Sequence, residues 1–158
     1  MEQQVYIELA EYVAGGRPLK ISQELISLVK RCGAFRKYSQ LYRIWFSIDA
    51  ESVVEKLRRG QPVKVQRTHA TTRSWASVEA MYSEEGYEGY PVLVTRYTDV
   101  IGFDPIEVLR KGLELGLAGE EVSFVKRAVI MHEHQKEICT LQPIVEIREK
   151  DVYKVLND

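Results

Sequence analysis

Residues 131–139 constrain the fold most, because this segment combines ionisable and hydrogen-bonding side chains with the spacing of a strand. In a strand, successive side chains point to opposite faces. One face would carry two carboxylates and an amide, which are costly to bury, so we expect it to be solvated or to border a cleft. That face holds Glu133, Gln135, Glu137 and Cys139, and the other holds His132, His134, Lys136 and Ile138.

The length of 158 residues predicts a single domain, residues 1–158, that is large enough to bury a hydrophobic core. A composition of 45% hydrophobic and 28% charged residues is typical of a globular protein. The net charge of -1 gives no electrostatic argument for a polyanionic partner, since nonspecific affinity for nucleic acid depends on many cations.

The cysteines and the distribution of apolar residues bear on the cellular setting. Cys32 and Cys139 form no CxxC motif, and no signal-like apolar run follows Met1. Both features favour a reducing, intracellular environment, so a cytoplasmic protein is expected. No segment approaches the roughly 20 apolar residues that span a bilayer, and no membrane partner is expected.

Segments with helical apolar spacing alternate with segments rich in turn residues. The predicted helices are residues 19–32, 49–59 and 104–116. Gly33 is a common helix stop, Asp49 and Asp104 are expected N-caps, and Pro105 suits the first helical position. The opening residues 2–13 mix strand formers with helix formers, and their type stays open.

β-branched and aromatic residues predict further strands. These are residues 40–47, 63–67, 92–97, 122–131, 144–147 and 152–155. The hydroxyl-rich residues 68–77 are expected to form a loop that caps a helix beginning near Val78, and residues 84–90 a second loop. Helices mainly in the first two-thirds of the chain, followed by strands, predict an α+β fold.

The chain lacks the Walker loop and the GxGxxG, HExxH and GxSxG motifs. His132 and His134 on one strand face, with His69 as a third ligand, would suit zinc, and partly exposed polar side chains are the alternative. Cys139 could act as a thiol nucleophile beside a histidine, but its apolar neighbours favour a small core residue.

Three separated motifs occur in a characteristic order. They are Leu41-Tyr42-Arg43, Arg73-Ser74-Trp75-Ala76-Ser77 and Gln135-Lys136-Glu137-Ile138. This order resembles that of mono-ADP-ribosyltransferases with an Arg-Ser-Glu active site. In that family an aromatic-Arg pair lies on an early strand, a Ser-Thr-Ser-like strand leads into a helix, and Glu/Gln-x-Glu lies on or before a late strand. Here Ala76 stands where the third hydroxyl is usual, unless Ser77 takes that place.

The resemblance implies helices packed on a split β-sandwich, NAD as co-substrate and no metal. The implied activity is that of an NAD-dependent glycosyltransferase, which transfers ADP-ribose to a macromolecular acceptor. A protein side chain is the expected acceptor, and nucleic acid is an alternative. A noncatalytic binding or inhibitory domain with the same fold is the competing class of function.

The resemblance also implies catalytic roles. Glu137 would grip a ribose hydroxyl and face the positive charge that develops as the nicotinamide–ribose bond breaks. Arg43 would bind the phosphates or the adjacent ribose with its planar guanidinium. Ser74 would hold Glu137 in its productive rotamer.

Further residues complete the implied site. Tyr42 accompanies Arg43 in the cofactor-binding motif, and Trp75 either packs against the nicotinamide or fills the core. Gln135 would meet the incoming nucleophile. By the resemblance, an amide in place of Glu at this position goes with asparagine- or glutamine-directed members more than with arginine-directed ones.

Overall fold

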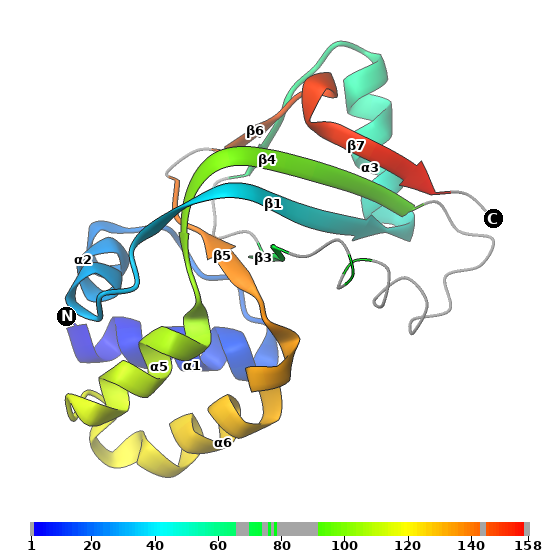
Figure 1. Ribbon diagram of the computed structural model, residues 1–158. Coiled ribbons are helices and arrows are strands. Elements are labelled where there is room, and N and C mark those ends of the chain that lie inside the picture. Colours follow the sequence, from blue (N-terminus) through cyan, green and yellow to red (C-terminus); the bar gives the residue numbers. More distant parts are fainter. Residues whose placement is uncertain are drawn as a thin grey trace.

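The computed structural model describes residues 2–65, 70–73, 76, 78, 92–142 and 145–156. Most helices gather at one end of the molecule, while α3 and the longer strands lie at the other (Figure 1). The helices are α1 (Glu2–Gly15), α2 (Gln23–Arg31), α3 (Ser47–Arg58), α5 (Pro105–Glu114) and α6 (Val122–His132), with 3-10 turns η1 (Gly119–Glu121), η2 (Glu133–Gln135) and η3 (Glu149–Asp151). Together with the antiparallel strands, they agree with the predicted α+β class.

The strands of the described residues form a larger and a smaller antiparallel sheet. They are β1 (Arg36–Phe46), β2 (Val63–Val65), β3 (Ala70–Thr71), β4 (Val92–Phe103), β5 (Ile138–Thr140), β6 (Val145–Ile147) and β7 (Val152–Leu156). The larger sheet has the order β1-β4-β5-β3, with β7 also paired to β4, and β2 pairs with β6. The ladder between β1 and β4 runs from Arg36 opposite Gly102 to Phe46 opposite Val92.

The larger sheet closes on itself through a bridge beyond β3. β4 pairs with β1 along one edge and, at Gly102, with β5 along the other. β5 pairs with β3, and Thr72 directly after β3 pairs with Tyr42 of β1. Gly102 permits the close β4–β5 contact, because a Cβ there would lie 2.6 Å from the Cys139 carbonyl oxygen. The pairings therefore run from β1 through β4, β5 and β3 back to β1.

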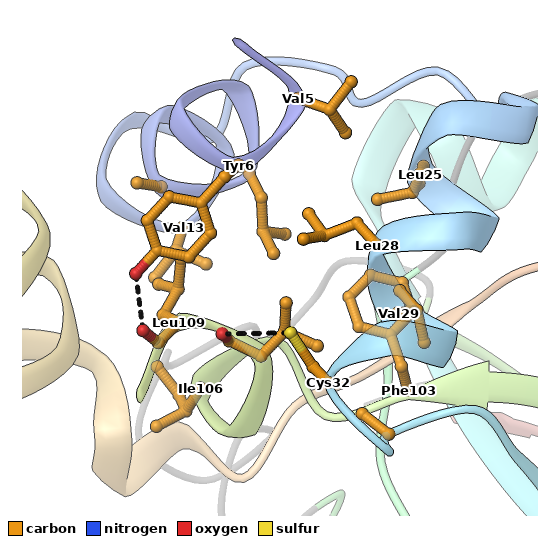
Figure 2. Close-up of a cluster of buried hydrophobic side chains, with 14 of the residues drawn as sticks. Val5, Tyr6, Val13, Leu25, Leu28, Val29, Cys32, Phe103, Ile106 and Leu109 are labelled. Carbon is orange, nitrogen blue, oxygen red and sulfur yellow. Dashed lines mark hydrogen bonds between the residues drawn. The ribbon is translucent and has the colours of Figure 1, made fainter. Parts of the chain in front are cut away.

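A cluster that we call the helix-side core fills the space among α1, α2, α5 and α6 (Figure 2). Fully buried Tyr6 of α1 lies within it, and its hydroxyl donates a hydrogen bond to the Leu109 carbonyl oxygen at 2.5 Å. Burying a large apolar side chain stabilises a fold by roughly 1.5–3 kcal/mol, and the hydrogen bond avoids the cost of an unpaired hydroxyl. Other members are Leu9, Leu25, Leu28, Phe103, Val125, Val129 and Cys139.

A second cluster, the sheet-side core, joins the β1–β4 ladder to α3. It includes Leu41, Ala50, Val53, Leu93, Tyr97, Val100 and Ile138. Strand alternation alone would place Tyr97 and Val100 on opposite faces. Both belong to this core because Asp99 between them has a left-handed φ of 54°, a conformation that aspartate tolerates better than most residues. β4 contributes to both cores, since its last residue, Phe103, lies in the helix-side core.

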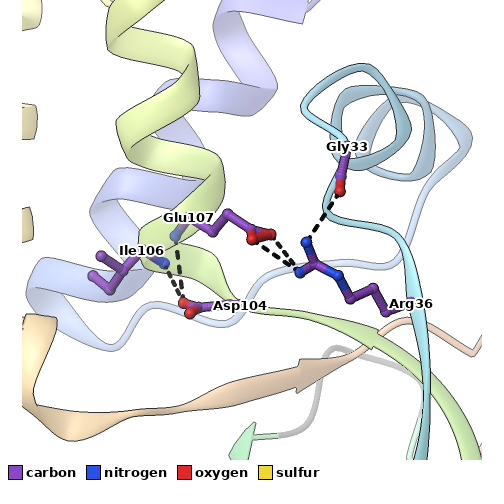
Figure 3. A network of polar contacts seen from close by, with 5 residues as sticks. All are labelled: Gly33, Arg36, Asp104, Ile106 and Glu107. Atoms are coloured by element: carbon purple, nitrogen blue, oxygen red, sulfur yellow. Dashed lines mark hydrogen bonds and ion pairs between the residues drawn. The ribbon is translucent and has the colours of Figure 1, made fainter.

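Polar contacts fasten the start of α5 to the start of β1 (Figure 3). Asp104 accepts hydrogen bonds from the Ile106 and Glu107 amides at 2.9 and 3.4 Å, which confirms it as the N-cap. Arg36 Nη1 donates to both carboxylate oxygens of Glu107, and its Nη2 donates to the Gly33 carbonyl oxygen. This ion pair is half-exposed, so it contributes on the order of 1 kcal/mol or less.

The other helix predictions are confirmed with changed starts. α2 begins later than predicted, where Ser22 Oγ accepts a hydrogen bond from the Leu25 amide at 3.1 Å. α3 begins before Asp49, so this residue lies in the first turn instead of at the N-cap. The opening segment, whose type the sequence left open, forms α1.

The prediction of a strand over residues 122–131 is wrong, because this segment forms most of α6. Val125, Ala128 and Val129 are buried, and spacings of three and four residues place them on one face of a helix. Although β-branched residues favour strands, burial of this face in the helix-side core outweighs local propensity. Helices therefore extend beyond the first two-thirds of the chain.

The strands predicted at residues 40–47, 92–97, 144–147 and 152–155 are confirmed with changed bounds as β1, β4, β6 and β7. Of the strand predicted at 63–67, β2 covers Val63–Val65. Residues 66–69, most of the segment 74–82 and the predicted loop at 84–90 lie outside the described residues. None of the described helices combines the length and apolar character needed to cross a membrane.

Gly112 of α5 provides a test of the helix-side core. A Cβ at this position would collide with the buried Tyr6 ring, so Gly112→Ala should destabilise the fold by about 1–3 kcal/mol through overpacking. Gly15→Ala is the matched control, because a Cβ at Gly15 meets nothing within 4 Å. Chemical denaturation measures both, and equal stability of the two variants would contradict the packing described.

Candidate functional site

Three segments that contain or directly precede the sequence motifs lie side by side. Tyr42 of β1 and Thr72 exchange backbone hydrogen bonds in both directions at 2.8 Å. On the other side of β3, Thr71 pairs with Ile138, and its Oγ1 also donates to the Ile138 carbonyl oxygen at 2.7 Å. Arg43 directly follows Tyr42, and Glu137 directly precedes Ile138. Segments far apart in the sequence thus become adjacent.

The prediction of one strand over residues 131–139 is wrong. α6 continues to His132, η2 follows, and Lys136 adopts a left-handed φ of 52° before β5 begins. Glu133 and Gln135 are exposed in η2 and do not share a strand face with Glu137. The helix-side core buries Val125, Ala128 and Val129 of the preceding turns of α6, and this burial outweighs the local propensity for a strand.

Glu137 is half-buried between β5 and α1. Its Oε1 accepts a hydrogen bond from the Tyr12 hydroxyl at 2.5 Å, and the Cys139 thiol lies 3.5 Å from the same oxygen. The Cys139 sulfur also lies 3.7 Å from the Tyr12 hydroxyl oxygen. Among the described residues, Oε2 accepts no hydrogen bond. One carboxylate oxygen is therefore anchored by two donors, while the other accepts no hydrogen bond from the part of the chain that the structure describes.

Burial keeps both donors around Glu137 protonated. It is the largest cause that raises the pKa of the Tyr12 hydroxyl far above its usual range, and the neighbouring Cys139 and Glu137 raise it further. Burial likewise raises the pKa of the fully buried Cys139 thiol well above its ordinary value, with Glu137 adding to the shift. At neutral pH, Tyr12 and Cys139 therefore present hydrogens, and not negative charge, to the carboxylate.

Arg43 belongs to a different set of contacts. Its guanidinium carbon lies 4.5 Å from the Trp45 ring centroid, which is cation–π geometry. Trp45 Nε1 donates to Thr95 Oγ1 at 3.0 Å, and Thr95 Oγ1 is also 3.0 Å from the Tyr97 hydroxyl. Trp45 and Tyr97 pack in the sheet-side core, whereas Cys139 beside Glu137 belongs to the helix-side core. The fold joins the segments of Arg43 and Glu137 without a contact between these two side chains.

The remaining predicted site residues differ in what the structure describes of them. Tyr42 is buried, and its hydroxyl donates to Gln40 Oε1 at 3.2 Å. Ser74, Trp75 and Ser77 lie outside the described residues. Ala76, between Trp75 and Ser77, is helical, and so is the fully buried Val78.

The structure bears on the zinc and thiol hypotheses, of which the zinc hypothesis depended on the predicted strand. His132 ends α6 and His134 lies in η2, so they do not project from one strand face. Within the described ranges, which omit His69, no group of three or more His, Cys, Asp or Glu side chains could hold a metal ion. Cys139 is fully buried, which confirms the interpretation of a small core residue over that of a nucleophile.

Tyr12 is the residue at this site that the sequence did not reveal. No motif marks it, and its hydrogen bond to Glu137 crosses 125 positions of the chain. Comparison of the chain with protein-family models, curated proteins and solved structures gives no match. The function must therefore be argued from the motifs and their geometry.

The raised thiol pKa values give a test of the packing around Glu137. At pH 8, the buried Cys32 and Cys139 should be labelled slowly by a thiol reagent, because burial raises both pKa values and leaves little thiolate. In denaturant, both thiols should react rapidly. Mass spectrometry of the labelled peptides measures each site, and rapid labelling of Cys139 in the native protein would contradict its burial.

Proposed function

We propose that this chain transfers ADP-ribose from NAD to a macromolecular acceptor, with a protein side chain as the acceptor class. The observation that supports this most is the adjacency of the three motif segments. Thr72 pairs with Tyr42 on one side, while Thr71 pairs with Ile138 on the other. The Arg-Ser-Glu resemblance requires such an adjacency, and an accidental match of short motifs does not.

The carboxylate of Glu137 fits the chemistry that the proposal gives it. An anchored oxygen fixes the rotamer, and the open Oε2 suits a ribose hydroxyl as hydrogen-bond donor. The negative charge lies where it stabilises the positive charge that develops on the ribose in the transition state. The nicotinamide–ribose bond breaks with its electron pair leaving on nicotinamide, and the acceptor forms the new bond to ribose and releases a proton.

The proposal gives the other motif residues binding and positioning roles. Arg43 binds the phosphates or the adjacent ribose, and its support is the position of its segment beside Thr72 rather than a contact with Glu137. Tyr42 and Trp75 complete the NAD-binding surface, and Ser74 positions Glu137, as the resemblance implies. The split β-sandwich of the family is the fold that we propose for the whole chain.

Gln135 contacts the acceptor in this proposal. It is exposed two residues before Glu137, so a macromolecular side chain can approach it without rearrangement of the core. The left-handed Lys136 between them separates their backbone directions, and the assignment of Gln135 depends on its exposure and on the family resemblance. Nucleic acid is the second acceptor class that the experiment must distinguish.

A noncatalytic binding or inhibitory domain is the competing function. The Tyr12–Glu137 hydrogen bond favours it, because an internal contact also gives the carboxylate a structural role. The open second oxygen favours the enzyme, since a purely structural carboxylate in a partly buried place is stabilised by pairing both oxygens.

Glu137→Gln tests the activity directly. With NAD labelled in its ADP-ribose part and a cell extract as acceptor mixture, the wild type should consume NAD and label macromolecules. The variant should lose roughly a hundredfold or more of this rate, because the amide keeps the shape but removes the negative charge. Protease and nuclease treatment of the product then identifies the acceptor class.

Glu133→Gln is the matched control for that change. Glu133 lies in the same region of the chain, but its carboxylate pairs with Arg110 on the surface, so the rate should stay at the wild-type level. A wild-type protein that neither binds nor consumes NAD would rule out the transferase and leave the binding domain. Equal losses in the two variants would argue against a specific role for Glu137.

A further inference from the structure

Helix α1 contacts Glu137 through a tyrosine, Tyr12. Tyr12 lies near the end of α1, which is otherwise a packing element of the helix-side core. Its hydroxyl donates a hydrogen bond to Glu137 Oε1 at an oxygen–oxygen distance of 2.5 Å, and the Cys139 thiol donates to the same oxygen. Two donors from different elements thus converge on one of the two carboxylate oxygens.

This convergence fixes the carboxylate in space. A hydrogen bond to a charged acceptor is shorter and stronger than a neutral one, and the Tyr12 ring is itself held against the helix-side core. With Oε1 held, rotation about the last side-chain bond is restricted, so Oε2 keeps a defined direction. Burial is the main cause that raises the pKa of Tyr12, so the phenol stays a hydrogen-bond donor across the neutral range.

We propose that Tyr12 is a positioning residue that holds Glu137 in its productive orientation and so makes α1 part of the transferase site. The inference rests on the proposed function, since it assigns to Tyr12 an effect on the transfer rate. It places no direct contact between Tyr12 and NAD. Its effect should therefore appear in kcat more than in the KM for NAD.

An inhibitory contact is the opposite interpretation of the same geometry. If the Tyr12 hydroxyl occupied the place of a ribose hydroxyl, its removal would raise the rate. The open Oε2 argues against this, because a ribose hydroxyl can bind there while Tyr12 keeps Oε1. The sign of the rate change therefore separates positioning from inhibition.

Tyr12→Phe is the direct test, because it removes the hydroxyl and keeps the ring. We expect kcat to fall roughly ten- to a hundredfold with little change in the KM for NAD, as for a misplaced catalytic group. Tyr6→Phe is the matched control on the same helix: its hydroxyl donates over the same 2.5 Å, but to the Leu109 carbonyl oxygen (Figure 2). Both variants should lower the midpoint of thermal unfolding, and only Tyr12→Phe should lower kcat.

The outcomes distinguish this inference from the proposed function. An active wild type with unchanged or raised kcat in Tyr12→Phe overturns the positioning role and leaves the transferase intact, whereas an inactive wild type overturns both. If Tyr12→Phe does not fold, Cys139→Ala removes the weaker donor to the same oxygen. It should then lower kcat by a smaller factor with the KM unchanged, and an unchanged kcat would again overturn the inference.

Discussion

The backbone hydrogen bonds of the short segment 70–72 hold the candidate site together. Thr72 pairs with β1 through Tyr42, and Thr71 pairs with β5 through Ile138. These pairings bring the segment of Arg43 beside that of Glu137. The Thr71 hydroxyl adds a hydrogen bond to the Ile138 carbonyl oxygen, which satisfies the buried polar side chain where β3 and β5 meet.

The surrounding fold fixes these pairings from two sides. On one side, β4 binds β5 at Gly102, where the absence of a side chain allows the backbones to approach closely. On the other, β1 is bound to β4 along nearly its whole length, and β4 contributes to both hydrophobic cores. The helix-side core then supplies Tyr12 to Glu137, while the sheet-side core holds the Arg43–Trp45 contact.

Local signals predicted much of this fold, and long-range packing determined the remainder. The N-cap at Asp104 and the strand-forming residues of β1 and β4 depend on neighbours in the sequence, so they were predictable. α6 was not, because its β-branched residues favour a strand until the helix-side core is present to bury one face.

Some residues of the candidate site were also predictable from the sequence, and others depend on long-range contacts. Motif order predicted Tyr42 and Glu137 as site residues, and the segments of both residues pair with residues 71–72. Tyr12 could not be found, since a tyrosine in a segment whose type the sequence left open gives no sign of a partner 125 positions away. The face shared by Gln135 and Glu137 was predicted from strand alternation, and the left-handed Lys136 removes that alternation.

The proposed function requires that NAD bind where the three motif segments meet. Titration of isotope-labelled Glu137→Gln protein with NAD, followed by backbone amide NMR, tests this directly while suppressing turnover. We expect saturable shifts concentrated at Tyr42–Arg43, Thr72–Arg73 and the residues around position 137. Shifts absent at saturating NAD, or confined to regions such as α3, would contradict it.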